Sequence, residues 1–331
     1  MNDEIYHRLA QVLDTLPNGF PATESGVEIR LLMRVFTPEQ AGLFCDLRLT
    51  FETAGEIAVR TGRPAEGLEN LLAGMADAGQ VMMIELEGTR FFRMLPWVFG
   101  IYEFQLHRMD QEFAEAVEGY WPAFGRQFFA NKPQLMQTLA VEEAIPFGQE
   151  TLPYERVSTI IENGQSFRVN ECVCKRERSL VGHSCDRPTD VCLAVAPVPG
   201  VFDKSVHGRV ITREEAYTLL DRAEEAGLVH LTANVQFGQF YICNCCKCCC
   251  GVLRAINDFR IPAQQVVNAH YRAEIDPAAC IGCGLCIRHC PAEAMRLVHK
   301  DPEALSTPPF TEAEWFQERG RLRGVDFTRY K

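Results

Sequence analysis

Cysteine is the residue type in which this sequence departs most from an ordinary soluble protein. The 331-residue chain contains 15 cysteines, and all but Cys45 follow position 170. Thiolates are soft ligands that suit iron–sulfur clusters and zinc. Cysteines that cluster within a long chain, rather than spreading through a short one, indicate reduced metal-binding thiols and not a disulfide framework. The spacing of each cluster should therefore indicate which metal chemistry it performs.

The last cysteine cluster has the spacing CxxCxxCxxxCP and ends at Pro291. Gaps of two residues let three thiolates wrap one face of a cubane, and Gly282 and Gly284 permit the tight turns that this requires. A zinc site more often has two CxxC pairs separated by a longer loop. The four cysteines of this cluster are Cys280, Cys283, Cys286 and Cys290.

This run resembles the bacterial ferredoxin family, and the resemblance covers about thirty residues, 271–300. It implies a [4Fe–4S] cluster bound by these four cysteines. In two-cluster ferredoxins the fourth cysteine of such a run ligates the other cluster. The resemblance therefore also implies that Cys290 has a partner run elsewhere in the chain.

The sequence CNCCKCCC, residues 243–250, is the candidate partner run. Cys243, Cys246 and Cys249 repeat CxxCxxC, but Leu253 stands where a ferredoxin has its fourth cysteine. A paired site can still be drawn. One cubane would be held by Cys243, Cys246, Cys249 and Cys290, and the other by Cys280, Cys283, Cys286 and one of Cys245, Cys248 or Cys250. The extra cysteines are either small buried residues and spare ligands, or part of a non-standard cluster or a redox-active thiol.

A third set consists of Cys172, Cys174, Cys185 and Cys192. If residues 166–174 are extended, Cys172 and Cys174 point to the same face, and the loop 182–189 would bring the other two cysteines to them. Four thiolates suit a third iron–sulfur cluster or a structural zinc ion, and the neighbouring clusters favour iron–sulfur. Cys45 lies alone in an apolar helix pattern and is expected to be a core residue.

Residues 1–95 are expected to form one domain of helices followed by a hairpin. Thr37 and Thr53 each begin a capping box, predicting helices over 38–47 and 54–61, and an apolar 3.6-residue pattern predicts a helix over 68–79. Residues 81–86 and 90–95 flank a glycine turn and predict a β-hairpin. This order resembles the winged helix-turn-helix family.

Charge argues against DNA binding by this domain. Residues 1–95 contain eight arginines, no lysine and fourteen acidic residues, a net charge of −6, and the whole chain carries −11. Affinity for a duplex comes largely from basic contacts to phosphate. We therefore expect a docking module, or one that forms a homodimer, and nucleic acid is disfavoured as a partner.

The remaining chain completes an α+β architecture. Residues 96–165 are rich in aromatic residues and are expected to form a helical connector. Residues 166–270 predict a cysteine-rich α+β module, with a helix opened by the capping box at Thr212 and strands over 228–231 and 236–242. The ferredoxin-like segment follows at 271–300, and residues 301–331 form a C-terminal tail.

The expected function is single-electron transfer between a protein donor and a protein acceptor, by a carrier or redox subunit rather than a free-standing enzyme. The chain is also similar to multi-domain ferredoxin-like proteins of anaerobic bacteria. Neither an export signal nor a transmembrane run is evident, which predicts a cytoplasmic protein without membrane insertion. Two alternatives stay open. One is an iron–sulfur transcription regulator; the other is a reductase or activator with a substrate-binding cluster in residues 243–250.

Overall fold

The computed structural model describes residues 3–16, 18–129, 133–145, 156–183, 185–275, 277, 280, 283, 284, 286, 290–292 and 294–298. The chain divides into two compact units. The first consists of Met1–Asp276 with Pro291–Glu293, and the second of Pro277–Cys290 with Ala294–Lys331. The expected tail, residues 301–331, lies outside the described residues.

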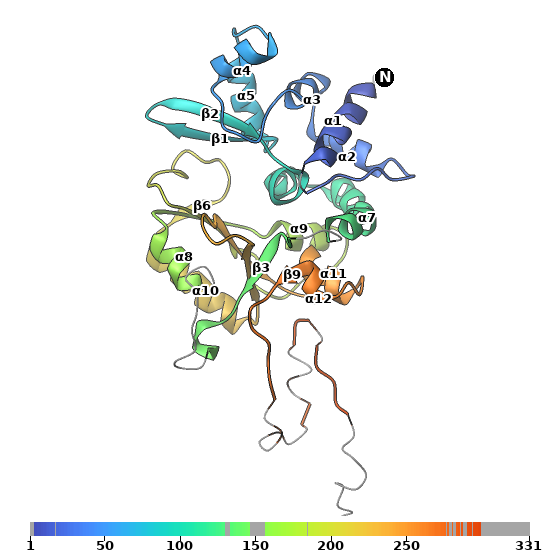
Figure 1. Ribbon diagram of the computed structural model, residues 1–331, viewed down its shortest axis with the longest axis vertical. Coiled ribbons are helices and arrows are strands. Elements are labelled where there is room, and N and C mark those ends of the chain that lie inside the picture. The colour runs from blue at the N-terminus through green and yellow to red at the C-terminus, as the bar shows by residue number, and fades with distance from the viewer. Residues whose placement is uncertain are drawn as a thin grey trace, which may run out of the picture. The chain divides into compact units, whose positions relative to one another are not determined.

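The N-terminal region has the predicted helices and hairpin (Figure 1). Both capping boxes form, because the side chains of Thr37 and Thr53 accept bonds from the backbone N–H three residues later. The hairpin strands pair antiparallel around Glu87 and Gly88. The elements are α1 (Glu4–Thr15), α2 (Val27–Val35), α3 (Pro38–Phe44), α4 (Ala54–Thr61), α5 (Leu68–Asp77), β1 (Val81–Leu86) and β2 (Thr89–Met94).

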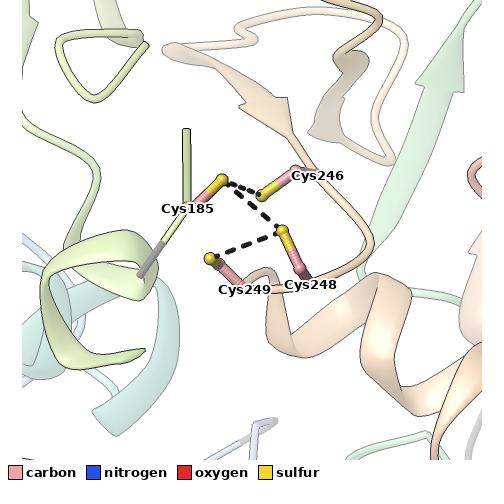
Figure 2. Close-up of side chains that lie close together, drawn as sticks. All are labelled: Cys185, Cys246, Cys248 and Cys249. Atoms are coloured by element: carbon pink, nitrogen blue, oxygen red, sulfur yellow. Dashed lines mark hydrogen bonds between the residues drawn. The ribbon is translucent and has the colours of Figure 1, made fainter. Parts of the chain in front are cut away.

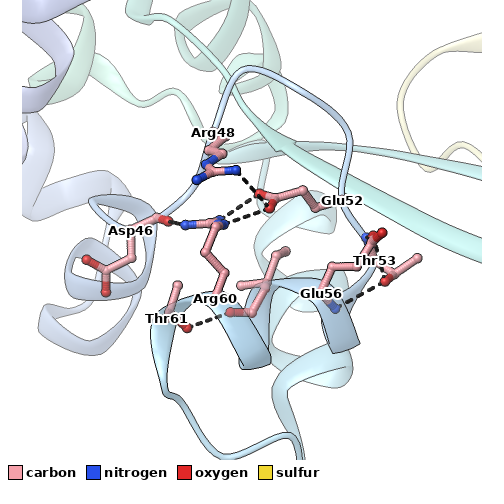
Figure 3. Close-up of polar contacts among 8 residues, drawn as sticks. Asp46, Arg48, Glu52, Thr53, Glu56, Arg60 and Thr61 are labelled. Atoms are coloured by element: carbon pink, nitrogen blue, oxygen red, sulfur yellow. Dashed lines mark hydrogen bonds and ion pairs between the residues drawn. The ribbon is translucent and has the colours of Figure 1, made fainter.

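The arginines of this region are largely neutralised by local acids. Figure 3 shows Arg60 donating to both carboxylate oxygens of Glu52 and to the carbonyl of Asp46. Asp46 in turn pairs with Arg63, at 2.6 Å, which lies just before the helix that would read DNA in a winged helix. These cations are therefore already engaged within the protein.

An aromatic core follows the hairpin. A kinked turn at Trp97–Ile101 leads into α6 (Tyr102–Phe104), and α7 (Gln111–Phe128) packs its apolar face on α2 and on the kink. The segment expected to be a helical connector is not helical throughout. β3 (Met136–Leu139) belongs to the main sheet and α8 (Val157–Asn163) packs on that sheet, because the apolar side chains in these stretches are buried within it.

Seven strands among the described residues form the main sheet, in the order β6-β4-β5-β8-β7-β3-β9. Of the strand pairs in the described part of the chain, only β3–β9 is parallel. The strands are β6 (Arg209–Ile211), β4 (Ser166–Asn170), β5 (Cys192–Ala196), β8 (Tyr241–Cys245), β7 (Val229–Ala233), β3 and β9 (Val267–Asn268). The strand predicted over 236–242 instead runs from Tyr241 to Cys245, so that Cys243 and Cys245 lie within it.

Helices cover the two faces of this sheet (Figure 1). α8 and α10 (Arg213–Glu225) pack on one face, in a core that includes Phe167, Leu193 and Ile242. α9 (Val173–Leu180) and α11 (Gly251–Asn257) belong to the larger core, together with α7 and the N-terminal helices. α12 (Ala263–Val266) leads into β9. The capping box predicted at Thr212 opens α10.

A buried ionic network joins α7, α9 and α11. Glu118 on α7 accepts two bonds from Arg254 on α11, at 2.6 and 3.0 Å, and pairs with Arg178 on α9 at 2.9 Å. Hydrogen bonds from these guanidinium groups, opposing the effect of burial, lower the pKa of Glu118 to about 2. Nearby Glu177 accepts from the Tyr102 hydroxyl, and burial raises its pKa to about 8. Glu118 is therefore the anion shared by two helices.

Replacing Glu118 with glutamine should cost the protein about 3 kcal/mol of unfolding free energy, because the guanidinium groups of Arg178 and Arg254, 13% and 8% exposed, lose the carboxylate that they share. Asp258→Asn is the matched control, since Asp258 also pairs with Arg254 but its side chain is 51% exposed; we expect a cost within about 1 kcal/mol. Anaerobic urea unfolding followed by circular dichroism measures both. Equal costs for the two variants would contradict the role assigned to Glu118.

Candidate metal centres

The first cysteines of the 243–250 run lie on β8, where successive side chains point to opposite faces of the sheet. On β8, Cys243 and Cys245 point to the face covered by α9 and α11, and Asn244 points to the opposite face. Asn244 is fixed there by His230, at 2.5 Å from Nδ1, and by donating to the carbonyl of Val191 at 2.7 Å. The His230 ring also contacts Glu224 of α10, at 3.0 Å. These buried bonds set which way the two thiols face.

Strand pairing brings Cys192 to Cys243. The antiparallel register of β5 and β8 pairs Leu193 with Ile242, so the next position along places Cys192 across from Cys243. Cys192 and Cys245 donate hydrogen bonds to the Cys243 sulfur, which lowers the pKa of Cys243 well below its usual range. The bond to Cys243 conversely raises the pKa of Cys192.

Cys172 and Cys174 reach the same region from the start of α9. The residues expected to be extended through Cys174 leave the sheet at Asn170, and Cys172 is the N-cap of α9. Its thiol accepts from the Cys174 thiol and from the backbone N–H of Lys175, which together lower the pKa of Cys172 despite its burial. The two thiols therefore meet across one helical turn and not along one face of a strand.

Together these cysteines line a cavity of about 50 Å³, which we call the six-thiol pocket. Cys250, the N-cap of α11, completes the set, and its thiol hydrogen-bonds with that of Cys245. Residues from the other thiol group described below, Cys246 and Cys249, also contribute to the wall. Of the eight cysteines that line it, the six that belong to this pocket alone are Cys172, Cys174, Cys192, Cys243, Cys245 and Cys250.

The other walls of the six-thiol pocket are mostly apolar, with aromatic and aliphatic side chains. Phe99, from the kinked turn, stacks on Tyr241 with ring centroids 5.4 Å apart. Trp121 packs directly on the backbone of Gly251, where an added Cβ would lie 2.4 Å from the indole ring. Glu103 also lines the pocket, where burial raises the pKa of its carboxyl to about 8, although the carboxyl accepts from the N–H of Gly100. The pocket is thus enclosed by groups that exclude water.

A second group of thiols adjoins this set and shares the pocket wall at Cys246 and Cys249 (Figure 2). The Cys185 sulfur lies 3.8 Å from that of Cys246 and 3.5 Å from that of Cys248, and the sulfurs of Cys248 and Cys249 are 3.7 Å apart. All four sulfurs lie within 4.8 Å of one another. We call Cys185, Cys246, Cys248 and Cys249 the four-thiol group.

The charge states within the four-thiol group differ between its members. The hydrogen bond from Cys249 is the main cause that lowers the pKa of Cys246 to about 5. Burial is the main cause that raises the pKa of Cys248 to about 12. When no cation is bound, Cys246 is therefore the thiolate of the group, and the thiols of Cys249 and Cys248 donate hydrogen bonds to it.

The structure groups these cysteines differently from the sequence expectation. Cys185 lies with the 246–249 turn and not with Cys172, Cys174 and Cys192. Cys243 lies in the six-thiol pocket and is separated from Cys246 and Cys249, because the strand ends at Cys245 and the chain turns. That each of these cysteines binds a metal stays a prediction. Cys45 packs against the N-terminal core, and burial raises the pKa of its thiol.

The second unit carries the remaining run. Cys280, Cys283 and Cys286 are exposed and Cys290 is half-buried, with its sulfur accepting from the N–H of Ala294 at 3.4 Å. Gly284 adopts a φ of 78°, which a residue with a side chain disfavours, as a tight turn between ligands requires. Gly282 lies outside the described residues.

Residues 273–296 match the family model of the 4Fe-4S binding domain. The chain carries a ferredoxin-type iron–sulfur domain. This match confirms the prediction made from the Cys280–Cys290 spacing, and a [4Fe–4S] cluster is the cofactor that it indicates. No curated protein and no solved structure matches the chain. Among the described residues, no helix has both the length and the apolar composition to cross a membrane.

The thiols of the first unit also fit metal centres. Ten sulfurs lie in two groups, and several are fully buried and share protons in hydrogen-bonded pairs. Buried thiolates without a cation are costly, whereas a coordinating metal deprotonates thiols outright. The arrangement can therefore hold iron–sulfur or zinc centres, because the bound metal itself would balance the charge of the thiolates.

Replacing Cys283 with alanine should lower the iron content by about four atoms per chain, with a matching loss of acid-labile sulfide, because one ligand of the ferredoxin-type cluster is removed. Iron and sulfide analysis of anaerobically purified protein measures this. Cys45→Ala is the control and should keep the full content. Unchanged iron in the Cys283 variant would contradict the assignment.

Proposed function

We propose that the protein passes single electrons between protein partners through at least two iron–sulfur centres. One is the ferredoxin-type [4Fe–4S] cluster of Cys280, Cys283, Cys286 and Cys290. The other is a cluster held in the six-thiol pocket. The observation that carries the proposal is the convergence of six buried or half-buried thiols on one cavity in a chain that already contains a ferredoxin-type domain.

The six-thiol pocket has the composition of an electron-transfer site. Its walls include Phe99, Tyr102 and Trp121, whose rings shield the thiols from water. A low-dielectric shell and hydrogen bonds to sulfur are the main means by which a protein sets a cluster's potential. The backbone N–H of Lys175, which points at Cys172, is one such hydrogen bond.

Lys175 supplies a buried positive charge beside the thiols. Its side chain lines the pocket, is 3% exposed, and donates to the carbonyl of Pro188. The ammonium acts on the thiols of both groups, at Cys172 and at Cys246. A buried cation needs a nearby anion, and an anionic metal–thiolate centre provides one.

The N-terminal region is proposed as a winged-helix-like protein-docking module. Six of its eight arginines form ion pairs with acidic side chains, which supports a protein partner over a phosphate backbone. The remaining two, Arg30 and Arg93, donate to the carbonyl of Ser25 and to the sulfur of Met82. The docked redox partner and any homodimer would use this region.

Metal analysis with EPR tests the proposed function. Anaerobically purified protein should contain at least about eight iron and eight sulfide per chain, and dithionite reduction should give S = 1/2 signals that interact magnetically. A redox titration should remove at least two electrons in one-electron steps. About four iron, all lost in the Cys283→Ala variant, would overturn the proposed second cluster.

Lys175→Met should make the reduction potential of the pocket cluster more negative. The added electron would lose a nearby positive charge, an effect on the order of tens of millivolts at protein dielectric values. EPR-monitored potentiometry measures the shift. The control is Lys204→Met, because Lys204 is 78% exposed and pairs with Glu85 on the hairpin. An unchanged potential in the Lys175 variant, with iron content intact, would show that this charge does not act on the cluster.

A further inference from the structure

The four-thiol group is too compact for an iron–sulfur cubane. A single ion with metal–sulfur bonds of about 2.3 Å in a tetrahedron holds its four sulfurs about 3.8 Å apart. Three of the six sulfur separations, 3.5, 3.7 and 3.8 Å, match this value, and all six are within 4.8 Å. In a cubane each cysteine thiolate binds a different iron, at a different corner of the cluster. The four cysteine sulfurs must therefore lie farther apart than around a single ion.

The local sequence also has the form of a single-ion site. Cys246 and Cys249 make a CxxC pair in the turn between β8 and α11, which is the spacing of zinc knuckles. The backbone N–H of Cys249 donates to the Cys246 sulfur, and the N–H of Cys250 donates to the carbonyl of Cys246, so the turn is closed by its own backbone. Cys248 lies within the pair, and Cys185 supplies the fourth sulfur from the loop before β5.

The burial of the group suits a structural ion. Cys246 and Cys249 are buried, Cys185 is half-buried and Cys248 is exposed, so the group lies where the protein meets solvent. All four positions of a tetrahedron are taken by protein sulfurs, which leaves no site for substrate or water. The buried ammonium of Lys175, close to Cys246, would offset part of the −2 charge of a divalent ion bound by four thiolates.

We propose that Cys185, Cys246, Cys248 and Cys249 bind one Zn²⁺ ion, distinct from the iron–sulfur centres. The ion would fasten the 185–191 segment to the turn between β8 and α11. Because Cys246 and Cys249 also line the six-thiol pocket, this clamp would fix one wall of the iron site. On binding, the thiols would release their protons to solvent through the exposed side of Cys248.

A pair of substitutions separates this zinc ion from the iron centres. Cys248→Ser removes a ligand of the four-thiol group, and Cys245→Ser removes a thiol of the six-thiol pocket. Metal analysis of anaerobically purified variants should show about one zinc per wild-type chain. We expect the Cys248 variant to lose zinc and retain its ferredoxin-type iron, and the Cys245 variant to retain zinc. Cys185→Ser should behave as Cys248→Ser.

Substitution with Co²⁺ gives a second measurement, because the visible absorption of the bound ion reports its coordination geometry and not the protein yield. Wild-type protein prepared with Co²⁺ should show the visible absorption of a tetrahedral tetrathiolate ion, and Cys248→Ser should lose that absorption while its circular dichroism is unchanged. Wild-type protein without zinc, or a Cys248 variant that keeps zinc and loses iron alone, would overturn the proposal. Zinc loss in the Cys245 variant equal to that in the Cys248 variant would also overturn it. The proposed electron transfer would survive any of these results, because it is tested by iron, sulfide and EPR.

Discussion

The carboxylate of Glu118 holds together the two helices whose first residues carry thiols into the pocket. Arg178 on α9 and Arg254 on α11 both pair with it, and Cys172 and Cys250 are the N-caps of these helices. The Glu118 side chain is only 20% exposed, so the loss of either guanidinium partner would leave its charge poorly compensated. The position of each helix, and hence of its thiol, therefore depends on a contact with α7 that contains no cysteine.

The sheet imposes the second constraint on the same thiols. Cys192 and Cys243 come from neighbouring antiparallel strands, and a slip of one residue in either would turn its thiol to the other face. The buried contacts of Asn244 with His230 and Val191 oppose such a slip of β8, because the Asn244 amide, the His230 ring and the Val191 carbonyl would lose these hydrogen bonds. Polar contacts on one face of β8 thus hold the thiols in place on the other.

These two constraints explain which features of the fold and of the thiol groups could be predicted from the sequence. The local signals were sufficient where the chemistry was local: the capping boxes at Thr37, Thr53 and Thr212 and the hairpin at Gly88 are confirmed, as is the ferredoxin-type run. The regrouping of Cys185 and Cys243 was not predictable, because it depends on strand register and on where β4 and β8 end. Those ends follow from burial across the sheet, which no spacing of cysteines encodes.

The same contrast separates the two kinds of site physically. In the ferredoxin-type run all four thiols lie within eleven residues, from Cys280 to Cys290, so their geometry depends on short turns. In the first unit the ten thiols come from two strands, two helix starts, a loop and a turn, so their geometry depends on the whole fold. A substitution far from any sulfur, such as one at Glu118, should therefore disturb the pocket and leave the ferredoxin-type cluster in place. Under the proposed function, a metal would balance the charge of these thiols, and folding of the first unit would then be coupled to metal binding.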